Sequence, residues 1–374
     1  MTEPIVALLG RRDAPTDAIE QYCTHLSQAL REHDFTMELL AAPWKERGWP
    51  ATLRNLQQRA AEWRGRWVLL QYTALSWSPR GFPLQVPRVI KILRDAGTLV
   101  GAVFHDAQPY SGGRAVDQLR RLVQQRIMRQ VLSSSDLAIL TVPSQKLHWI
   151  PPTLKKASFI PVGANLPLIT SSGSSNSLHD GAMPTVAVFG VTGGSEGRQE
   201  VAQITEAMRF ATEKLGNLRL LVFGRNADAA EAGLRERLRA LPVTLRVAGV
   251  LPEGDVEALL RSSDVLLFVR GPISSRRGSA IAGIACGLPV IAFAGSETAA
   301  PITDAGVVLV PGGNKTALGE ALVRVLSDRE YHARLAQRSR SAYQKHFSWE
   351  AIAGKYASLL RAQLEAARLD AKKG

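Results

Sequence analysis

Hydrophobic residues recur along the chain in short apolar runs that alternate with segments of helical spacing. Runs such as 5–10, 67–72 and 185–190 end at or next to a polar or glycine position and predict strands buried on both faces. Between them, as in 18–33, apolar residues return at the spacing of one helix face. Repeated strand–helix units of this kind predict parallel sheets covered by helices on both sides.

The pattern is interrupted by a segment rich in Ser, Gly and Asn at 170–183, which has no apolar periodicity. That composition indicates a linker. The strand–helix pattern precedes it in 1–169 and restarts in 184–348, and a last helical segment occupies 349–374. The sequence therefore predicts an α/β protein of two doubly wound, Rossmann-like domains, and the cleft between such domains is the default ligand site.

The composition narrows the class of protein. The chain has 374 residues, of which 45% are hydrophobic and 21% charged, so disorder is excluded. No apolar run is long enough to cross a bilayer, and the N-terminal residues lack the charge order of a secretory signal. Two cysteines cannot form a disulfide framework or a Cys-rich metal site. We expect a cytoplasmic protein, with peripheral contact at the inner face of the membrane as an alternative.

The formal net charge of +13 calls for an anionic partner. Most bases alternate with acids on predicted helix faces, and no nucleic-acid-binding signature is present, so nucleic acid is the least favoured partner. A local excess of arginine lies in the predicted helix 115–132. Such a helix suits anionic lipid headgroups or phosphorylated ligands, and a solvated basic face is the alternative.

Four runs in the second half stand in a recognisable order. They are VLPEGDVEALLRSSDVLLF (250–268), IACGLPVIAF (284–293), SETAAPITDAGVVLVPGGNKTAL (296–318) and LSDREYHARLAQRSRSAYQKHFSWEAIAGKYASLL (326–360). Together they resemble the donor domain of the retaining glycosyltransferases known as group 1 or family 4, which have the GT-B fold. The resemblance implies that the C-terminal domain binds a nucleotide-diphosphate sugar, whose sugar passes to a saccharide, lipid-linked or small-molecule acceptor on the N-terminal domain.

The same resemblance implies retention of configuration at the sugar and no metal or other cofactor. It also implies that the last helix, 349–374, packs back toward the N-terminal domain. The first half is similar more loosely, at 15–30, 104–106 and 159–165.

Two departures concern the donor site. The family's pair of glutamates falls on Ser274 and Ala282, and its basic pair falls near Val191 and Glu196. In place of the first glutamate stands SSRRGS (274–279), where small residues and two arginines precede a predicted helix. Because a helix N-terminus offers free N–H groups, we expect a rebuilt phosphate site there. The alternative is that Ser274 caps the helix and the arginines are solvated.

The candidate site residues form three groups. The donor and phosphate-binding candidates are Gly190, Thr192, Gly193, Arg198, Arg225, Ser274, Ser275, Arg276, Arg277, Gly278 and Ser279. The catalytic candidates are His105, Asp106 and Glu297, which follow predicted strands and have ordinary loop residues as the alternative interpretation. The acceptor-side candidates are Arg11, Asp17 and Tyr110, on loops of the first domain. No pair of histidines has metal-ligand spacing, so no metal site is expected.

These features favour a glycosyltransferase. Because both glutamates are missing, a non-catalytic GT-B protein that binds a sugar nucleotide or a protein partner is the alternative. A GT-B sugar-nucleotide epimerase is less favoured because the Ser-Gly-Gly-x-x-Glu-Glu run of that class is absent.

Overall fold

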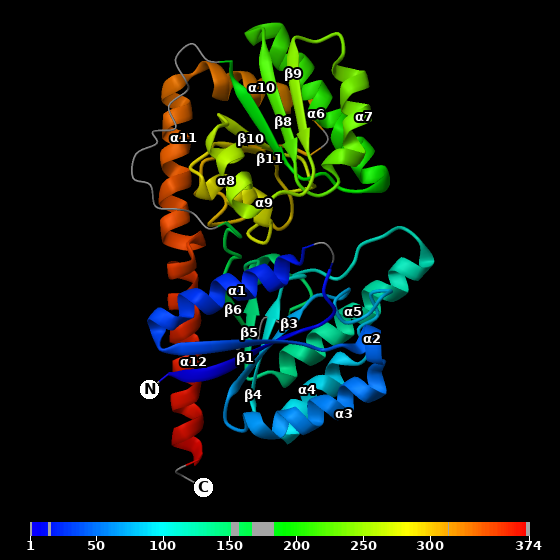
Figure 1. The fold of residues 1–374 in the computed structure, drawn as a ribbon, viewed down its shortest axis with the longest axis vertical. Coiled ribbons are helices and arrows are strands. Elements are labelled where there is room, and N and C mark those ends of the chain that lie inside the picture. Colours follow the sequence, from blue (N-terminus) through cyan, green and yellow to red (C-terminus); the bar gives the residue numbers. More distant parts are fainter. Residues whose placement is uncertain (1, 14–15, 151–156, 167–182, 313, 372–374) are drawn as a thin grey trace. The chain divides into compact units, whose positions relative to one another are not determined.

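The computed structural model describes residues 2–13, 16–150, 157–166, 183–312 and 314–371. The chain divides into two compact units, each built on its own sheet (Figure 1). The first unit consists of Met1–Pro161 and Trp349–Gly374, and the second of Val162–Ser348. The linker predicted at 170–183 lies, except for its last residue, outside the described residues. Within the described ranges, none of the helices combines the length and apolar character needed to span a bilayer.

The first unit contains a six-stranded parallel sheet in the order β2-β1-β3-β4-β5-β6. Its strands are β1 (Glu3–Leu9), β2 (Phe35–Ala41), β3 (Trp67–Tyr72), β4 (Leu99–Phe104), β5 (Leu137–Leu140) and β6 (Ala157–Phe159). Because β1 lies between β2 and β3, the strand order reverses between β1 and β3, and the carboxyl ends of these two strands form a switch point where ligands commonly bind.

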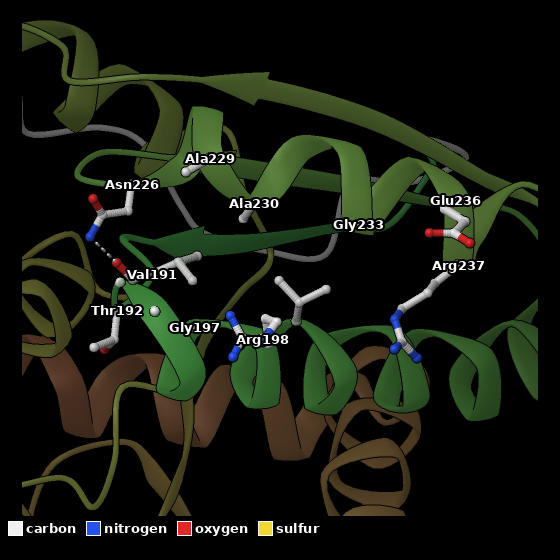
Figure 2. Close-up of a pocket in the computed structure, with 13 residues that line it drawn as sticks. Val191, Thr192, Gly197, Arg198, Asn226, Ala229, Ala230, Gly233, Glu236 and Arg237 are labelled. Carbon is white, nitrogen blue, oxygen red and sulfur yellow. Dashed lines mark hydrogen bonds between the residues drawn. The ribbon is translucent and has the colours of Figure 1, made fainter.

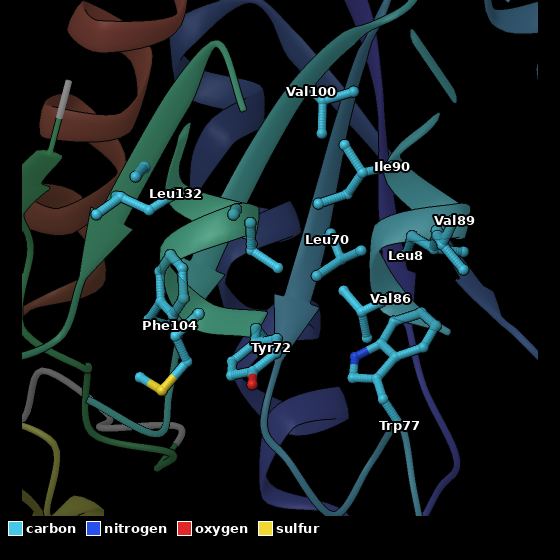
Figure 3. Close-up of a cluster of buried hydrophobic side chains, with 14 of the residues drawn as sticks. Leu8, Leu70, Tyr72, Trp77, Val86, Val89, Ile90, Val100, Phe104 and Leu132 are labelled. Carbon is cyan, nitrogen blue, oxygen red and sulfur yellow. The ribbon is translucent and has the colours of Figure 1, made fainter. Parts of the chain in front are cut away.

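Helices cover this sheet on both faces. They are α1 (Ala18–Leu30), α2 (Trp44–Arg47), α3 (Trp49–Ala60), α4 (Val86–Asp95), α5 (Ala115–Ser134) and α12 (Trp349–Ala371), with 3₁₀ turns at Arg31–His33, Ala61–Trp63 and Ser144–Lys146. Figure 3 shows Leu70, Tyr72 and Phe104 from the strands packed with Trp77 in one hydrophobic cluster. This core holds the strand ends, and therefore the loops that follow them, in fixed positions.

The last helix, α12, completes the first unit by packing on α1. The hydroxyl groups of Tyr22 and Tyr356 lie 2.9 Å apart and are buried. The indole N–H of Trp67 donates to the carbonyl of Leu360 at 3.3 Å. All seven tryptophans of the chain, including Trp349 at the start of α12, belong to this unit.

The second unit contains a six-stranded parallel sheet in the order β12-β11-β10-β7-β8-β9. Its strands are β7 (Thr185–Phe189), β8 (Leu218–Phe223), β9 (Val243–Ala248), β10 (Val265–Phe268), β11 (Val290–Phe293) and β12 (Val307–Val310). The strand order reverses between β7 and β10, so the carboxyl ends of these strands form the switch point of this sheet.

The helices of this unit are α6 (Gly194–Leu215), α7 (Ala227–Leu238), α8 (Glu253–Arg261), α9 (Gly278–Ala285), α10 (Lys315–Ser327) and α11 (Arg329–Ala342), followed by a π-helical turn at Tyr343–Phe347. Helices α6 and α10 pack closely because Gly319 faces Phe210, and a Cβ added at Gly319 would lie 2.6 Å from the Phe210 Cβ.

The predicted α/β class with two doubly wound parallel sheets is confirmed. The structure adds three details to the sequence-based expectation. Strand β2 and helix α3 were not predicted, and α6 begins at Gly194, directly after the predicted donor residues Thr192 and Gly193. Helices α10 and α11 are separated at Asp328, whose side chain accepts a hydrogen bond from the Tyr331 N–H and caps α11.

Candidate functional site

At the switch point of the second unit, a glycine and an arginine follow the two central strands. Gly190 comes directly after β7, and Arg270 lies two positions beyond the end of β10. Gly190 has a φ of +81°, and a Cβ there would lie 3.1 Å from Nη1 of Arg270. A glycine is therefore favoured both by its backbone conformation and by the guanidinium beside it.

The Arg270 guanidinium is largely removed from water. Burial lowers the pKa of Arg270, and the nearby charge of Arg225 lowers it further. The carboxylate of Glu200 acts in the opposite direction and raises it. The Nε atom of Arg270 is buried and has no hydrogen-bond partner among the described residues. Buried polar groups normally have a partner, so a cation left in this state is typical of a site for an anionic ligand. Arg270 is not among the residues predicted from the sequence, although its position just after a strand at the switch point is a usable signal.

The loop after β10 carries the serines and arginines predicted to bind phosphate. Arg277 is the N-cap of α9, and its N–H donates to the Ser274 carbonyl at 3.0 Å. Gly278 and Ser279 form the first turn of α9. The Ser274 hydroxyl does not cap the helix; it is buried and has no partner in the described part of the chain.

Arg277 extends back over the start of this loop. A Cβ at Gly271, which has a φ of +69°, would lie 3.7 Å from Nη2 of Arg277. Gly271 is the residue that follows Arg270 in the chain. The structure thus brings Arg277, from the predicted phosphate loop, to the same end of β10 as Arg270.

Arg276 and Glu297 form an ion pair between the loops that follow β10 and β11. Nε of Arg276 lies 2.8 Å from one Glu297 carboxylate oxygen, and Nη2 lies 3.3 Å from the other. The two side chains are 22% and 11% exposed. The alternative in which Arg276 is simply solvated is therefore not what the structure shows. Arg276, which was predicted to bind phosphate, and Glu297, which was predicted to be catalytic, therefore neutralise each other's charge.

The same two loops interlock at neighbouring positions. The Thr298 hydroxyl donates to the Ile273 carbonyl at 2.6 Å and accepts from the Gly295 N–H at 2.9 Å. A Cβ at Gly295 would lie 2.3 Å from the Pro272 Cβ, so only glycine fits. These contacts fix the position of the Arg276–Glu297 pair.

A pocket of about 490 Å³ opens between α6 and α7 (Figure 2). Three of the predicted donor residues line it, namely Thr192, Gly193 and Arg198. The other lining residues are Val191, Gly194, Gly197, Val201, Asn226, Ala229, Ala230, Gly233, Glu236 and Arg237. Gly193 is the N-cap of α6, and Asn226 donates to the Val191 carbonyl at 3.0 Å, which links two lining residues of the pocket. Thr192, Gly193 and Arg198 therefore lie at this pocket, and residues 274–279 lie on the loop after β10 and at the start of α9. Gly190 follows β7 beside Arg270, and Arg225 follows β8 and Gly224.

In the first unit, His105 follows β4 and is fixed by Gln71. The two side chains meet at 2.9 Å, between His105 Nε2 and Gln71 Oε1. Because the Gln71 amide nitrogen donates to the Leu69 carbonyl, its oxygen faces the ring, and Nε2–H of His105 is the donor. Burial lowers the pKa of His105 to about 4, although the charge of Asp17 opposes this shift. The ring is therefore neutral at pH 7. Its partner Gln71 is not among the residues predicted from the sequence.

The remaining candidates of the first unit lie on neighbouring loops. Asp106 accepts a hydrogen bond from the Ala74 N–H at 3.0 Å. Asp17 caps α1 by accepting from the backbone of residues 19 and 20. Arg11 donates its backbone N–H to the Ser76 carbonyl at 2.8 Å, across the switch point between β1 and β3. Tyr110 is 45% exposed and lies under the Arg120 guanidinium, 4.8 Å from the ring centroid.

The described residues contain no group of three or more His, Cys, Asp or Glu side chains arranged to hold a metal ion. The titratable groups of the candidate site are instead dominated by arginine.

Comparisons with known proteins agree on the fold. Residues 186–328 match the family model described as glycosyl transferases group 1. Anabaena HepE in complex with UDP and glucose superimposes with a TM-score of 0.65, at 14% identity over 96% of this chain and 100% of that chain. WaaG, described as a glycosyltransferase of lipopolysaccharide biosynthesis, gives 0.59 at 16% identity over 95% and 99% of the two chains.

A Listeria monocytogenes protein described as a UDP-N-acetylglucosamine 2-epimerase gives a TM-score of 0.63 at 13% identity, over 98% of both chains. A comparison with curated protein sequences found no significant match. The protein has the GT-B fold, and most of its second unit matches the group 1 glycosyl transferase model.

Proposed function

We propose that the protein is a glycosyltransferase. It takes a sugar from a nucleotide-diphosphate donor and delivers it to a saccharide, lipid-linked or small-molecule acceptor. The observation that carries the proposal is the arginine group of the second unit. Arg277 reaches back to Gly271, the residue after Arg270, and Arg225, directly after β8 and Gly224, is close enough to lower the pKa of Arg270.

The charges of this group suit a diphosphate. Arg270 is largely buried, with Glu200 and Arg225 near enough to act on its pKa, whereas Arg276 and Glu297 neutralise each other. Guanidinium groups bind phosphate oxygens through paired N–H donors, so an arginine at this strand end suits a diphosphate. The first turn of α9 adds backbone N–H groups beside Arg277.

In the proposed reaction the bond between the sugar C1 and the diphosphate oxygen breaks while an acceptor hydroxyl oxygen bonds to C1. Negative charge then grows on the leaving diphosphate, and Arg270 and Arg277 stabilise it more strongly in the transition state than in the bound donor. The acceptor proton leaves with the diphosphate or with solvent. Solved structures of HepE contain UDP and UDP-glucose, which supports a sugar nucleotide as the donor.

Retention of configuration and independence of a metal ion belong to the same proposal. The configuration of the product is read from the anomeric proton coupling in its NMR spectrum. Metal independence predicts equal turnover with a chelator and with added Mg²⁺ or Mn²⁺, and a chelator-sensitive rate would contradict it.

The function is tested by screening UDP-, GDP- and ADP-sugars for thermal stabilisation and for slow donor hydrolysis, with and without acceptors. The variant Arg277→Ala is compared with Arg239→Ala, an exposed arginine at the end of α7. We expect one of the three nucleotide series to raise the melting temperature of the wild-type protein. The Arg277→Ala variant should lose this stabilisation, and the Arg239→Ala variant should keep it. Diphosphate binding that survives in Arg277→Ala would refute the arginine site.

A second candidate, a GT-B protein that binds a sugar nucleotide without turnover, is favoured by one observation. The carboxylate of Glu297 is engaged by Arg276, and the positions of the family's glutamates hold Ser274 and Ala282. Under this alternative a sugar nucleotide stabilises the protein, yet no hydrolysis or transfer occurs with any acceptor. The Glu297→Gln variant then binds as the wild type does.

A further inference from the structure

Exposed hydrophobic side chains gather at one place on the first unit. Eight large hydrophobic residues are exposed in the described part of the chain, and half of them lie on α5 or just before it. Val116, Leu119 and Leu122 are 47%, 56% and 64% exposed, and Tyr110 is 45% exposed. Single exposed leucines are ordinary on protein surfaces, but a run over successive helical turns forms a patch that needs a partner.

In its first half, helix α5 carries apolar residues on its outer side, whereas its buried residues there, Asp117 and Gln124, are polar. Its inner side carries the buried residues Asp117, Gln124, Ile127, Met128, Val131 and Leu132. At 3.6 residues per turn, Leu119 and Leu122 fall on the opposite side, with Val116 at its border and Arg126 one turn further along. The outer leucines therefore take no part in the core of the domain. In Figure 1 the first half of α5 projects from its domain.

The patch is surrounded by positive charge. Arg114, Arg120, Arg121, Arg126 and Arg129 lie on α5 or cap it, whereas Asp117 is the only acid between residues 107 and 135. Asp117 is buried and paired with Arg114 and Arg120. Arg126 is exposed on the same side as the two leucines, whereas Arg121 is exposed on a flank, about 100° around the helix from Leu122. No acidic side chain of α5 other than the buried Asp117 accompanies them.

The patch is held in shape by polar contacts beneath it. The Gln124 side chain donates to the Gly81 carbonyl at 2.8 Å and accepts from the Tyr110 N–H at 2.6 Å. Arg120 donates to the Arg80 carbonyl at 2.9 Å. These bonds tie two loops to α5, so the exposed side chains are presented on a pre-formed surface and little conformational entropy is lost when a partner binds.

We propose that Val116, Leu119, Leu122 and their flanking arginines, here termed the α5 patch, dock the protein on an anionic lipid bilayer. The two leucines enter the boundary between headgroups and acyl chains, and Arg121 and Arg126 contact lipid phosphates. An apolar stripe bordered by arginine is the pattern of helices that lie in a membrane interface. A second copy of the chain fits less well because it would bring the same arginines face to face. This inference does not depend on sugar transfer.

The test is sedimentation of the full-length protein with vesicles of equimolar phosphatidylglycerol and phosphatidylcholine, and with vesicles of phosphatidylcholine alone. We expect binding to the anionic vesicles, weaker binding to the neutral ones, and loss of binding at high salt. The double variant Leu119→Ser/Leu122→Ser should lower the partition coefficient at least about tenfold, since it removes the inserted apolar area. Arg121→Gln/Arg126→Gln should lower it about tenfold or more, since each arginine near an anionic surface is worth about fivefold.

Matched controls lie on the second unit. Val250→Ser/Leu309→Ser removes two exposed apolar residues, and Arg219→Gln/Arg239→Gln removes two exposed arginines. Both controls should bind vesicles as the wild type does, and all variants should keep the wild-type melting temperature. Equal loss in the controls, no binding of the wild type to anionic vesicles, or a dimer in solution that the leucine variant dissociates would each overturn the proposal.

Discussion

At the scale of single residues, the second unit contains a positively charged side chain that is largely removed from water. Arg270 is the clearest case, because burial lowers its pKa and its Nε lacks a partner in the described residues. Desolvation of such a group costs folding free energy, which the Glu200 carboxylate offsets in part and a bound anion would offset further. Stability and binding should therefore respond to its removal in opposite directions.

The variant Arg270→Met tests this relation, since methionine keeps much of the side-chain volume without the charge. We expect UDP to bind at least about tenfold more weakly, because a charge-assisted hydrogen bond is worth about 1.5–3 kcal/mol. The unliganded protein should be as stable as the wild type or more stable, by about 1 kcal/mol. Calorimetric titration and urea unfolding followed by circular dichroism measure the two effects, with Arg239→Met as the control. A variant that loses stability and binding together would indicate a purely structural role.

His105 offers a residue-scale test in the first unit. Its pKa is lowered to about 4 by burial, from an ordinary value of 6.5. The unfolded chain therefore takes up a proton at a higher pH than the native chain does, and stability falls as the pH decreases from about 6.5 toward 4. Between pH 7.5 and pH 5 we expect a loss of about 2 kcal/mol that is absent in His105→Gln. Tryptophan fluorescence during urea unfolding reports this unit, since all tryptophans lie in it. An identical pH dependence in both proteins would contradict the prediction.

At the scale of elements, helix α12 joins the first unit although it lies far from it in the sequence. Its contact with α1 includes the buried hydroxyl pair of Tyr22 and Tyr356, 2.9 Å apart. Desolvation raises the pKa of both tyrosines, which remain neutral and depend on each other for a hydrogen bond. The contact is thus polar at its centre and apolar around it.

Removing both hydroxyl groups should cost less free energy of unfolding than the sum of the two single removals. Tyr356→Phe leaves the Tyr22 hydroxyl buried without its partner, and we expect a loss of about 1–3 kcal/mol. The double variant Tyr22→Phe/Tyr356→Phe should lose less than the sum of the two single variants. Fluorescence-detected unfolding measures all three. Additive losses would mean that the two hydroxyl groups do not act as a pair.

The secondary-structure elements also show which features can be predicted from the sequence and which cannot. Strand β3 was predicted with its observed bounds, because a continuous apolar run buried on both faces has few alternative structures. The edge strand β2 was missed because its second half is only partly buried and its pattern is weak. At the candidate site, Arg276 and Glu297 were both predicted, but their ion pair depends on how two loops interlock in space. Arg270 was missed because a single arginine carries no periodic signal, and only the strand order places it at a switch point.

At the scale of the whole molecule, the two units have separate hydrophobic cores and separate reporters. The core of the second unit contains no tryptophan, whereas the first unit contains all seven. Units with their own cores commonly unfold in separate transitions. Tryptophan fluorescence should then follow the first unit alone, and circular dichroism should follow both.

This separation makes the location of the donor site measurable without a ligand-bound structure. If a nucleotide diphosphate binds at the arginine group of the second unit, it stabilises that unit by about 2.7 kcal/mol at a concentration one hundred times its Kd. We expect UDP or the preferred nucleotide to move the circular-dichroism transition of the second unit and to leave the fluorescence transition in place. A nucleotide that shifts only the fluorescence transition would bind to the first unit, which would contradict the prediction. In that case the anionic ligands expected from the net charge of +13 would bind to the first unit, which also carries the α5 patch.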